Sequence, residues 1–145
     1  MKTLIAGNWK MNGNLESARA LIADIVNGLY EREDLHEKCD FLVCPPALHL
    51  GSVRHALVGY PKIAFGGQDC SSEDNGAHTG DISAAMLKDS SCSYVIVGHS
   101  ERRADHGEGD SVEKAKASIA LANDLTPIIC VGESLVEREA GNALD

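Results

Sequence analysis

Polar side chains that can hold an oxyanion or move a proton follow two apolar runs of this sequence. The run over residues 94–97 ends at Gly98 and is followed by His99 and Glu101. The run that begins at Thr3 is followed by Asn8 and Lys10. A lysine ammonium binds anionic oxygens, and an imidazole exchanges a proton near neutral pH. Together these residues predict a site for an anionic oxygen or a phosphorylated substrate.

The local context of His99 favours a role in proton transfer. Ser100, Glu101 and Arg102 are typical of the opening of a short helix, whose N-terminal dipole would disfavour the imidazolium. A neutral imidazole there donates or shuttles a proton. Structural alternatives stay open: His99 as a histidine with only structural hydrogen bonds, Lys10 as a surface lysine, and Glu101 with Arg102 as a solvated or supporting ion pair.

The elements that must position these residues are short apolar runs rich in Val, Ile and Phe. Their length and their Gly or Pro stops are typical of strands buried on both faces of a parallel sheet. Five such runs are "TLIAGNW" from Thr3, "CDFLVCPP" from Cys39, "KIAFGGQ" from Lys62, "SYVIVGHS" from Ser93 and "TPIICVGE" from Thr126.

Segments with helical periodicity lie between the predicted strands. The clearest is 15–29, where apolar residues recur at helical spacing and Asn14 is a suitable N-cap. We also predict helices over 49–58 and 82–88, one over 111–123 with Val112, Ala115, Ile119 and Ala122 on a shared face, and one that begins near Ser134.

The alternation of strand and helix predicts an α/β fold with right-handed βαβ units and a parallel sheet, in one domain over 1–145. Periodicity alone leaves an open doubly wound sheet and a (β/α) barrel as alternatives. In both folds, ligands bind at the carboxyl ends of the strands. Residues that follow the predicted strands should therefore meet on one face, namely Asn8, Lys10, Pro45, Pro46, Gln68, Asp69, His99, Ser100, Glu101 and Glu133.

Composition excludes several other classes of function. The net charge of −9 opposes binding to nucleic acid. No run is long and apolar enough for a membrane span or a secretory signal, which predicts a cytoplasmic protein. The five cysteines contain no C-x-x-C pair and are expected to be reduced thiols in or near the core. Metal, dinucleotide and serine-hydrolase motifs are absent.

Three motifs at strand ends, "AGNWKMNG", "VIVGHSERR" and "TPIICVGE", closely resemble the triosephosphate isomerase family. The resemblance continues through "QDCSSEDNGAHTGDISAAML" and "LVEREAG". It implies the TIM (β/α)8 barrel, of which this chain carries the first five βα units. It also implies interconversion of dihydroxyacetone phosphate and glyceraldehyde 3-phosphate through an enediolate, in glycolysis and gluconeogenesis, without a cofactor, by a homodimer.

The resemblance assigns roles to individual residues. Asn8 and Lys10 match the substrate-binding pair, with Lys10 facing the phosphate and the enediolate, and His99 matches the electrophile. Glu101 matches a supporting charge beside Lys10, and Cys130 matches a mainly structural thiol. The stretch 68–86 matches the loop that enters the partner subunit, so Gln68, Thr79 and Asp81 are expected at a dimer interface. Asp81 stands where the family commonly has Glu, one methylene longer.

The resemblance also shows what this sequence lacks. A complete barrel has eight βα units in roughly 250 residues. No carboxylate here matches the catalytic glutamate, and the late phosphate-binding loops have no counterpart. We therefore expect this sequence to be part of a full isomerase and to be inactive on its own. The alternatives are a non-catalytic half-barrel that acts by binding or complementation, and another phosphosugar-binding barrel.

Overall fold

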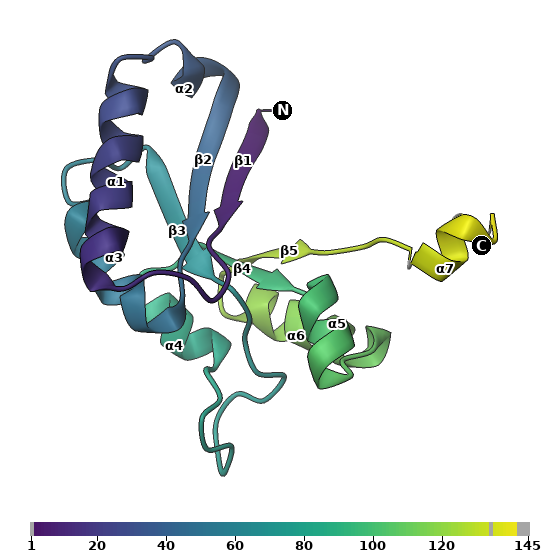
Figure 1. Ribbon diagram of the computed structural model, residues 1–145. Helices are drawn as coiled ribbons and strands as arrows, with labels where there is room; N and C mark the ends of the chain where they lie inside the picture. The colour runs from purple at the N-terminus through teal and green to yellow at the C-terminus, as the bar shows by residue number, and fades with distance from the viewer. Residues whose placement is uncertain (1, 134, 142–145) are drawn as a thin grey trace.

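A curved sheet of five parallel strands forms the centre of the computed structural model, which describes residues 2–133 and 135–141 (Figure 1). The strands pair in chain order, as successive right-handed βαβ units require. Their bounds are β1 Thr3–Asn8, β2 Cys39–Cys44, β3 Ile63–Gly67, β4 Tyr94–Val97 and β5 Thr126–Ile129. Each of the five predicted strands is therefore confirmed in position, and the sheet curls in the way that part of a barrel would.

Helices connect the strands and cover the convex side of the sheet. In Figure 1, α1 and α3 lie along β1–β3, and α4 and α6 lie near β4 and β5. The bounds are α1 Leu15–Tyr30, α2 Leu35–Lys38, the 3₁₀ helix η1 Ala47–His49, α3 Leu50–Ala56, α4 Ala84–Asp89, α5 Ser100–His106, α6 Asp110–Ala122 and α7 Leu135–Glu139.

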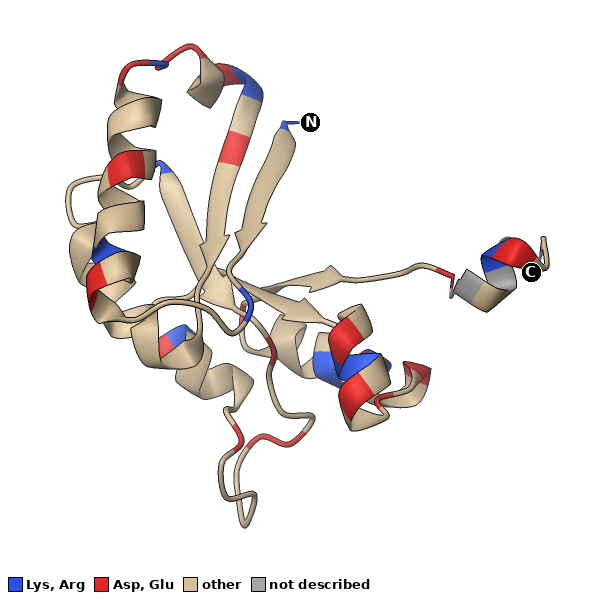
Figure 2. Cartoon of the chain, viewed as in Figure 1, with Lys and Arg blue, Asp and Glu red and all other residues tan. Residues whose placement is uncertain are grey.

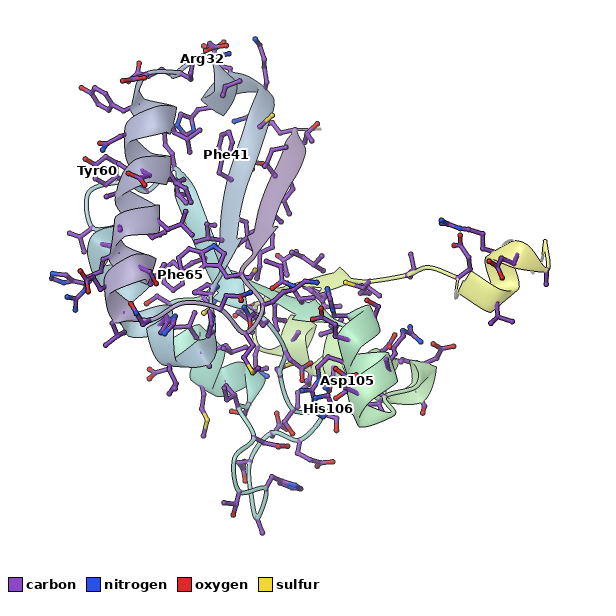
Figure 3. The ribbon with its side chains drawn as sticks, in the orientation of Figure 1. Arg32, Phe41, Tyr60, Phe65, Asp105 and His106 are labelled. Carbon is purple, nitrogen blue, oxygen red and sulfur yellow. The ribbon has the colours of Figure 1, made fainter. Side chains whose placement is uncertain are left out.

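The two faces of the sheet bury different side chains. Facing the helices, Val43, Phe65 and Val95 belong to the larger core, and Phe41 packs against it (Figure 3). On the concave face, Leu42 and Ile96 belong to a smaller core. This alternation follows from the two-residue period of a strand. The parallel pairing of the strands puts their exits along one rim.

The edge strands depart from the sequence prediction. We expected every strand to be buried on both faces, but β1 is largely exposed and β5 is only partly covered. Ile5 is 50% exposed and Ile129 is 53% exposed. Because neither strand has an outer neighbour among the described residues, its apolar side chains lack the packing that the central strands receive.

The helix predictions are confirmed for position, with one error of face. Asn14 caps α1 through a capping box with Ser17. On α6, however, the buried face carries Glu113, Lys116 and Ala120, while Val112 is exposed. Charged partners bind the buried side chains of Glu113 and Lys116. The stripe of apolar residues predicted for this helix therefore did not identify its inner face. The predicted start near Ser134 lies outside the described residues, and α7 follows directly.

Charged residues are spread unevenly over the chain. Figure 2 shows Lys, Arg, Asp and Glu gathered on α5 and the start of α6. Most of the sheet carries few charges. None of the described helices is long and apolar enough to cross a membrane.

The five cysteines are free thiols, and the three most buried are expected to resist alkylation. Burial raises the pKa of Cys44 to about 12 and those of Cys70 and Cys92 to about 11. At pH 8 a thiol with a pKa of 11 is thiolate in only about one molecule in a thousand. We therefore expect iodoacetamide at pH 8 to modify the partly exposed Cys39 first. Peptide mass mapping, with a urea-unfolded control, measures the order, and early native labelling of Cys44 would contradict it.

Candidate active site

A pocket of about 590 Å³ opens at the carboxyl ends of the strands. Six of the strand-exit residues predicted from the sequence line it, namely Asn8, Lys10, Gln68, Asp69, His99 and Glu101. They come from the exits of β1, β3 and β4, which confirms that separate strands bring them to one rim.

The loop after β1 presents Lys10 in an unusual backbone conformation. Lys10 has a φ of +54°, which costs a non-glycine residue roughly 1 kcal/mol or more. The Oδ1 atom of Asn8 accepts a hydrogen bond from the backbone N–H of Lys10 at 2.9 Å and supports this conformation. The strained turn thus directs the lysine toward the pocket instead of along the strand.

Gln68 holds the same loop from the other side. Its Nε2 atom donates to the carbonyl of Lys10 at 2.9 Å and to the carbonyl of Cys44 at 2.8 Å. One amide thereby ties the exits of β1 and β2 to the exit of β3. The sequence resemblance placed Gln68 at a dimer interface, and within one chain the structure gives it these positioning contacts.

Lys10, Glu101 and His99 lie together at the pocket. The Nζ atom of Lys10 is 2.6 Å from Oε1 of Glu101. The hydrogen bond from Lys10 lowers the pKa of the Glu101 carboxyl, so this carboxylate stays ionised below its usual range. This contact is compatible with the supporting role expected of Glu101.

His99 is the N-cap of the predicted short helix α5. Its Nδ1 atom accepts the backbone N–H of Glu101 at 3.3 Å and is 3.5 Å from Oε2 of that residue. Because the backbone N–H uses the lone pair on Nδ1, the ring proton of a neutral imidazole lies on Nε2. That tautomer can donate a hydrogen bond to a substrate oxygen.

A partly buried network of four charged residues lies at the side of the pocket, and the sequence analysis missed it. Lys116, with a side chain only 5% exposed, contacts both Asp69 and Glu108 at 2.7–2.9 Å. Arg102 contacts the same two carboxylates, Asp69 at 3.2 Å and Glu108 at 2.5 Å. The sequence signal that could have revealed this network is the spacing of charged residues along α6, which puts them on its inner face. The network joins the exit of β3 to α5 and α6.

The two carboxyl groups of this network respond differently to it. Burial raises the pKa of Asp69 despite the opposing effect of Lys116. For Glu108, burial opposes but does not cancel the hydrogen bonds from Arg102 and Lys116, and its pKa is lowered. Of the two carboxylates, Asp69 therefore depends more on Lys116 to stay ionised.

Thr79 and Asp81 lie outside this group, on the loop over residues 68–83. Both are exposed, and Figure 1 shows the loop projecting away from the sheet between β3 and α4. Asp81 accepts a hydrogen bond from the hydroxyl of Ser71 at 2.8 Å, which closes the base of the loop. Whether these two residues meet a second subunit stays a prediction.

Cys130 also lies away from the pocket. It packs against the smaller core on the concave face of the sheet, and its backbone N–H donates to the carbonyl of Val97 at 2.9 Å. Burial first, and then the charge of Glu113, raises the pKa of its thiol. Packing beside the strand that leads to His99 is compatible with the mainly structural role expected of it.

Comparison with known proteins decides which family presents such a pocket. The sequence model described as triosephosphate isomerase matches residues 3–145. This chain belongs to the triosephosphate isomerase family. It is similar to the triosephosphate isomerase of Afipia carboxidovorans, with 50% identity over the whole chain and 56% of the relative. It is also 51% identical to that of Mycobacterium ulcerans, over 97% of the chain and 54% of the relative.

A solved structure of the family has the same fold. A crystal structure of triosephosphate isomerase from Bartonella henselae matches the whole chain with a TM-score of 0.82 and 41% identity. The match covers 58% of the Bartonella chain. Five strands in barrel order are therefore confirmed as part of a triosephosphate isomerase barrel. The chain spans little more than half the length of the relatives that it matches.

Proposed function

We propose that the protein to which this chain belongs is a triosephosphate isomerase, interconverting dihydroxyacetone phosphate and glyceraldehyde 3-phosphate. The observation that carries the proposal is the convergence of Lys10, Glu101 and His99 on one pocket. When a proton leaves the carbon next to the substrate carbonyl, negative charge develops on the carbonyl oxygen. An ammonium and an N–H donor at this pocket would stabilise that charge. No step calls for a redox cofactor, because the reaction moves a proton between two carbons.

The described residues account for the electrophilic half of this reaction. The Nε2–H of His99 would donate to the substrate carbonyl and to the enediolate oxygen formed from it. Lys10 would face the same oxygen and the substrate phosphate. Because both donors are already held by Glu101, Asn8 and Gln68, little reorganisation is needed during the reaction.

These contacts do not supply the general base that would remove the proton from the substrate. Asp69, Glu101 and Asp105 are the carboxylates that line the pocket. Glu101 and Asp69 are each bound by a cation, Lys10 or Lys116, and Asp105 does not match the catalytic glutamate of the family. We infer that the base, and the groups that hold the substrate phosphate, belong to the part of the relatives that this chain does not span. Residues 1–145 alone are therefore expected to be inactive.

We further propose that the full-length protein is a homodimer in the cytoplasm. The exposed loop with Thr79 and Asp81 would enter the partner subunit, as the family resemblance implies. Five free thiols fit a reducing compartment, where disulfides rarely form. No nucleic acid or membrane partner is proposed.

A coupled assay with glyceraldehyde 3-phosphate tests the proposal on two polypeptides. Residues 1–145 alone should turn over no faster than the buffer. A chimera that joins them to the remaining part of the Bartonella henselae enzyme should be an active isomerase, since it restores the unmatched length. Circular dichroism confirms that both are folded. Turnover by residues 1–145 would refute the inference that the base lies outside them. A folded but inactive chimera would refute the proposed function.

A further inference from the structure

A buried carboxylate, that of Glu113, lies against the turn that leads into His99. The Glu113 side chain is only 5% exposed, and its Oε2 atom accepts a hydrogen bond from Nη2 of Arg103. Its Oε1 atom is buried and has no hydrogen-bond partner among the described residues. Such a group is costly to bury, so its position calls for a physical reason.

The neighbour of this carboxylate is Gly98. A Cβ atom placed on Gly98 would lie 2.6 Å from both Cδ and Oε2 of Glu113. Gly98 also has a φ of +71°, a conformation that favours glycine. The carboxylate therefore packs directly on the Cα of the residue before His99, and only glycine leaves room for it.

Arg103 completes the contact. Its Nε atom donates to the carbonyl of Gly98 at 3.3 Å, while Nη1 donates to Asp110 at 2.8 Å. One guanidinium thus connects the carbonyl of the turn to Glu113, which packs beneath it. The carboxylate of Asp110 also neutralises Arg103, but its side chain is 90% exposed, and no contact between it and Gly98 is seen in the described residues.

We propose that Arg103 and Glu113 are a positioning pair, which holds the Gly98–His99 turn and so orients the imidazole at the pocket. Since Asp110 already supplies Arg103 with a carboxylate, charge balance alone does not explain why Glu113 is buried. What Glu113 adds is direct packing of its carboxylate against the Cα of Gly98. This inference rests on the proposed function, in which His99 donates a hydrogen bond to the substrate.

The expected effect follows from the geometry of the turn. Without the charged pair, the Gly98–His99 peptide has one less restraint, and the imidazole is free to shift. A misplacement of about 1 Å at a reacting group lowers the rate roughly 100-fold. Because the substrate would still meet Lys10, binding should change far less than turnover.

The test compares three variants of the full-length protein, expressed from its natural gene. Glu113→Gln keeps the shape of the side chain but removes its charge, and should lower kcat about 10-fold or more with KM within about twofold. It should also shift the ¹⁵N resonances of the His99 ring. Arg103→Lys, which lacks the planar fork, should act in the same direction. Asp110→Asn touches the same guanidinium away from the turn and should leave kcat and the His99 resonances unchanged.

The outcomes separate positioning from mere stability. If Glu113→Gln lowers the unfolding midpoint in urea but leaves kcat and the His99 resonances as they were, the pair is a structural ion pair and the inference is wrong. If Glu113→Gln does not fold, Arg103→Lys decides by the same measurements. An unmodified protein without isomerase activity would refute the proposed function, and the His99 resonances would still decide whether the pair orients the ring.

Discussion

His99→Gln is expected to lower the kcat of the full-length enzyme by a factor of about 10³, with little loss of fold. Glutamine keeps a neutral amide of similar reach, but its donor is less acidic than an imidazole N–H and lacks the fixed Nδ1 contact to the backbone of Glu101. The substrate still meets Lys10, so KM should change much less than kcat. Steady-state assays in both directions of the reaction measure the two constants.

A matched control separates this effect from general perturbation. His55→Gln makes the same chemical change at an exposed residue of α3 that does not line the pocket. It should leave kcat unchanged. Urea unfolding of both variants should give similar midpoints. A His99→Gln enzyme with unchanged kcat would remove His99 from the catalytic residues.

Lys116→Met is expected to destabilise the protein by roughly 3 kcal/mol at pH 7.5. Lys116 is almost fully buried between Asp69 and Glu108, and methionine has a similar length but no charge. Its loss leaves Arg102 as the remaining cation that contacts both carboxylates within the described residues. The free energy of unfolding from urea titrations measures the loss. Lys114→Met, at an exposed site of the same helix, should cost little.

The destabilisation should decrease as the pH falls. Burial already raises the pKa of Asp69, and removal of Lys116 takes away a group that lowers it. A carboxyl group whose pKa is higher in the folded state destabilises the fold when it is ionised, above that pKa. Protonation of Asp69 as the pH falls should therefore restore part of the stability of Lys116→Met. An equal loss at pH 5 and pH 7.5 would show that packing, and not charge, is what Lys116 contributes.

Much of the site could be predicted because its residues are adjacent to strand ends. The exits after β1 and β4 were visible as an abrupt change from apolar to polar residues, and parallel strands bring their exits to one rim. The capping of α1 by Asn14 was equally local. Such features need only a few neighbouring residues, so a sequence pattern is sufficient to detect them.

The positioning contacts were not predictable in the same way. Gln68 and Lys10 are 58 residues apart, and the amide of Gln68 finds two backbone carbonyls only after three strands have paired. The inner face of α6 was misassigned because Glu113 and Lys116 were expected on the outside. Their burial depends on Arg103, Asp69 and Glu108, which other segments supply.

The sequence by itself determined the order of strands and helices, the residue types at each strand exit, and the family. These follow from local periodicity and from motifs within a few residues of each other. Only the tertiary structure decided which charges are buried, how Lys10 is held at a φ of +54°, and that Glu113 lies against Gly98. The physical reason is that burial and electrostatic pairing depend on distances in space, which no spacing along the chain specifies.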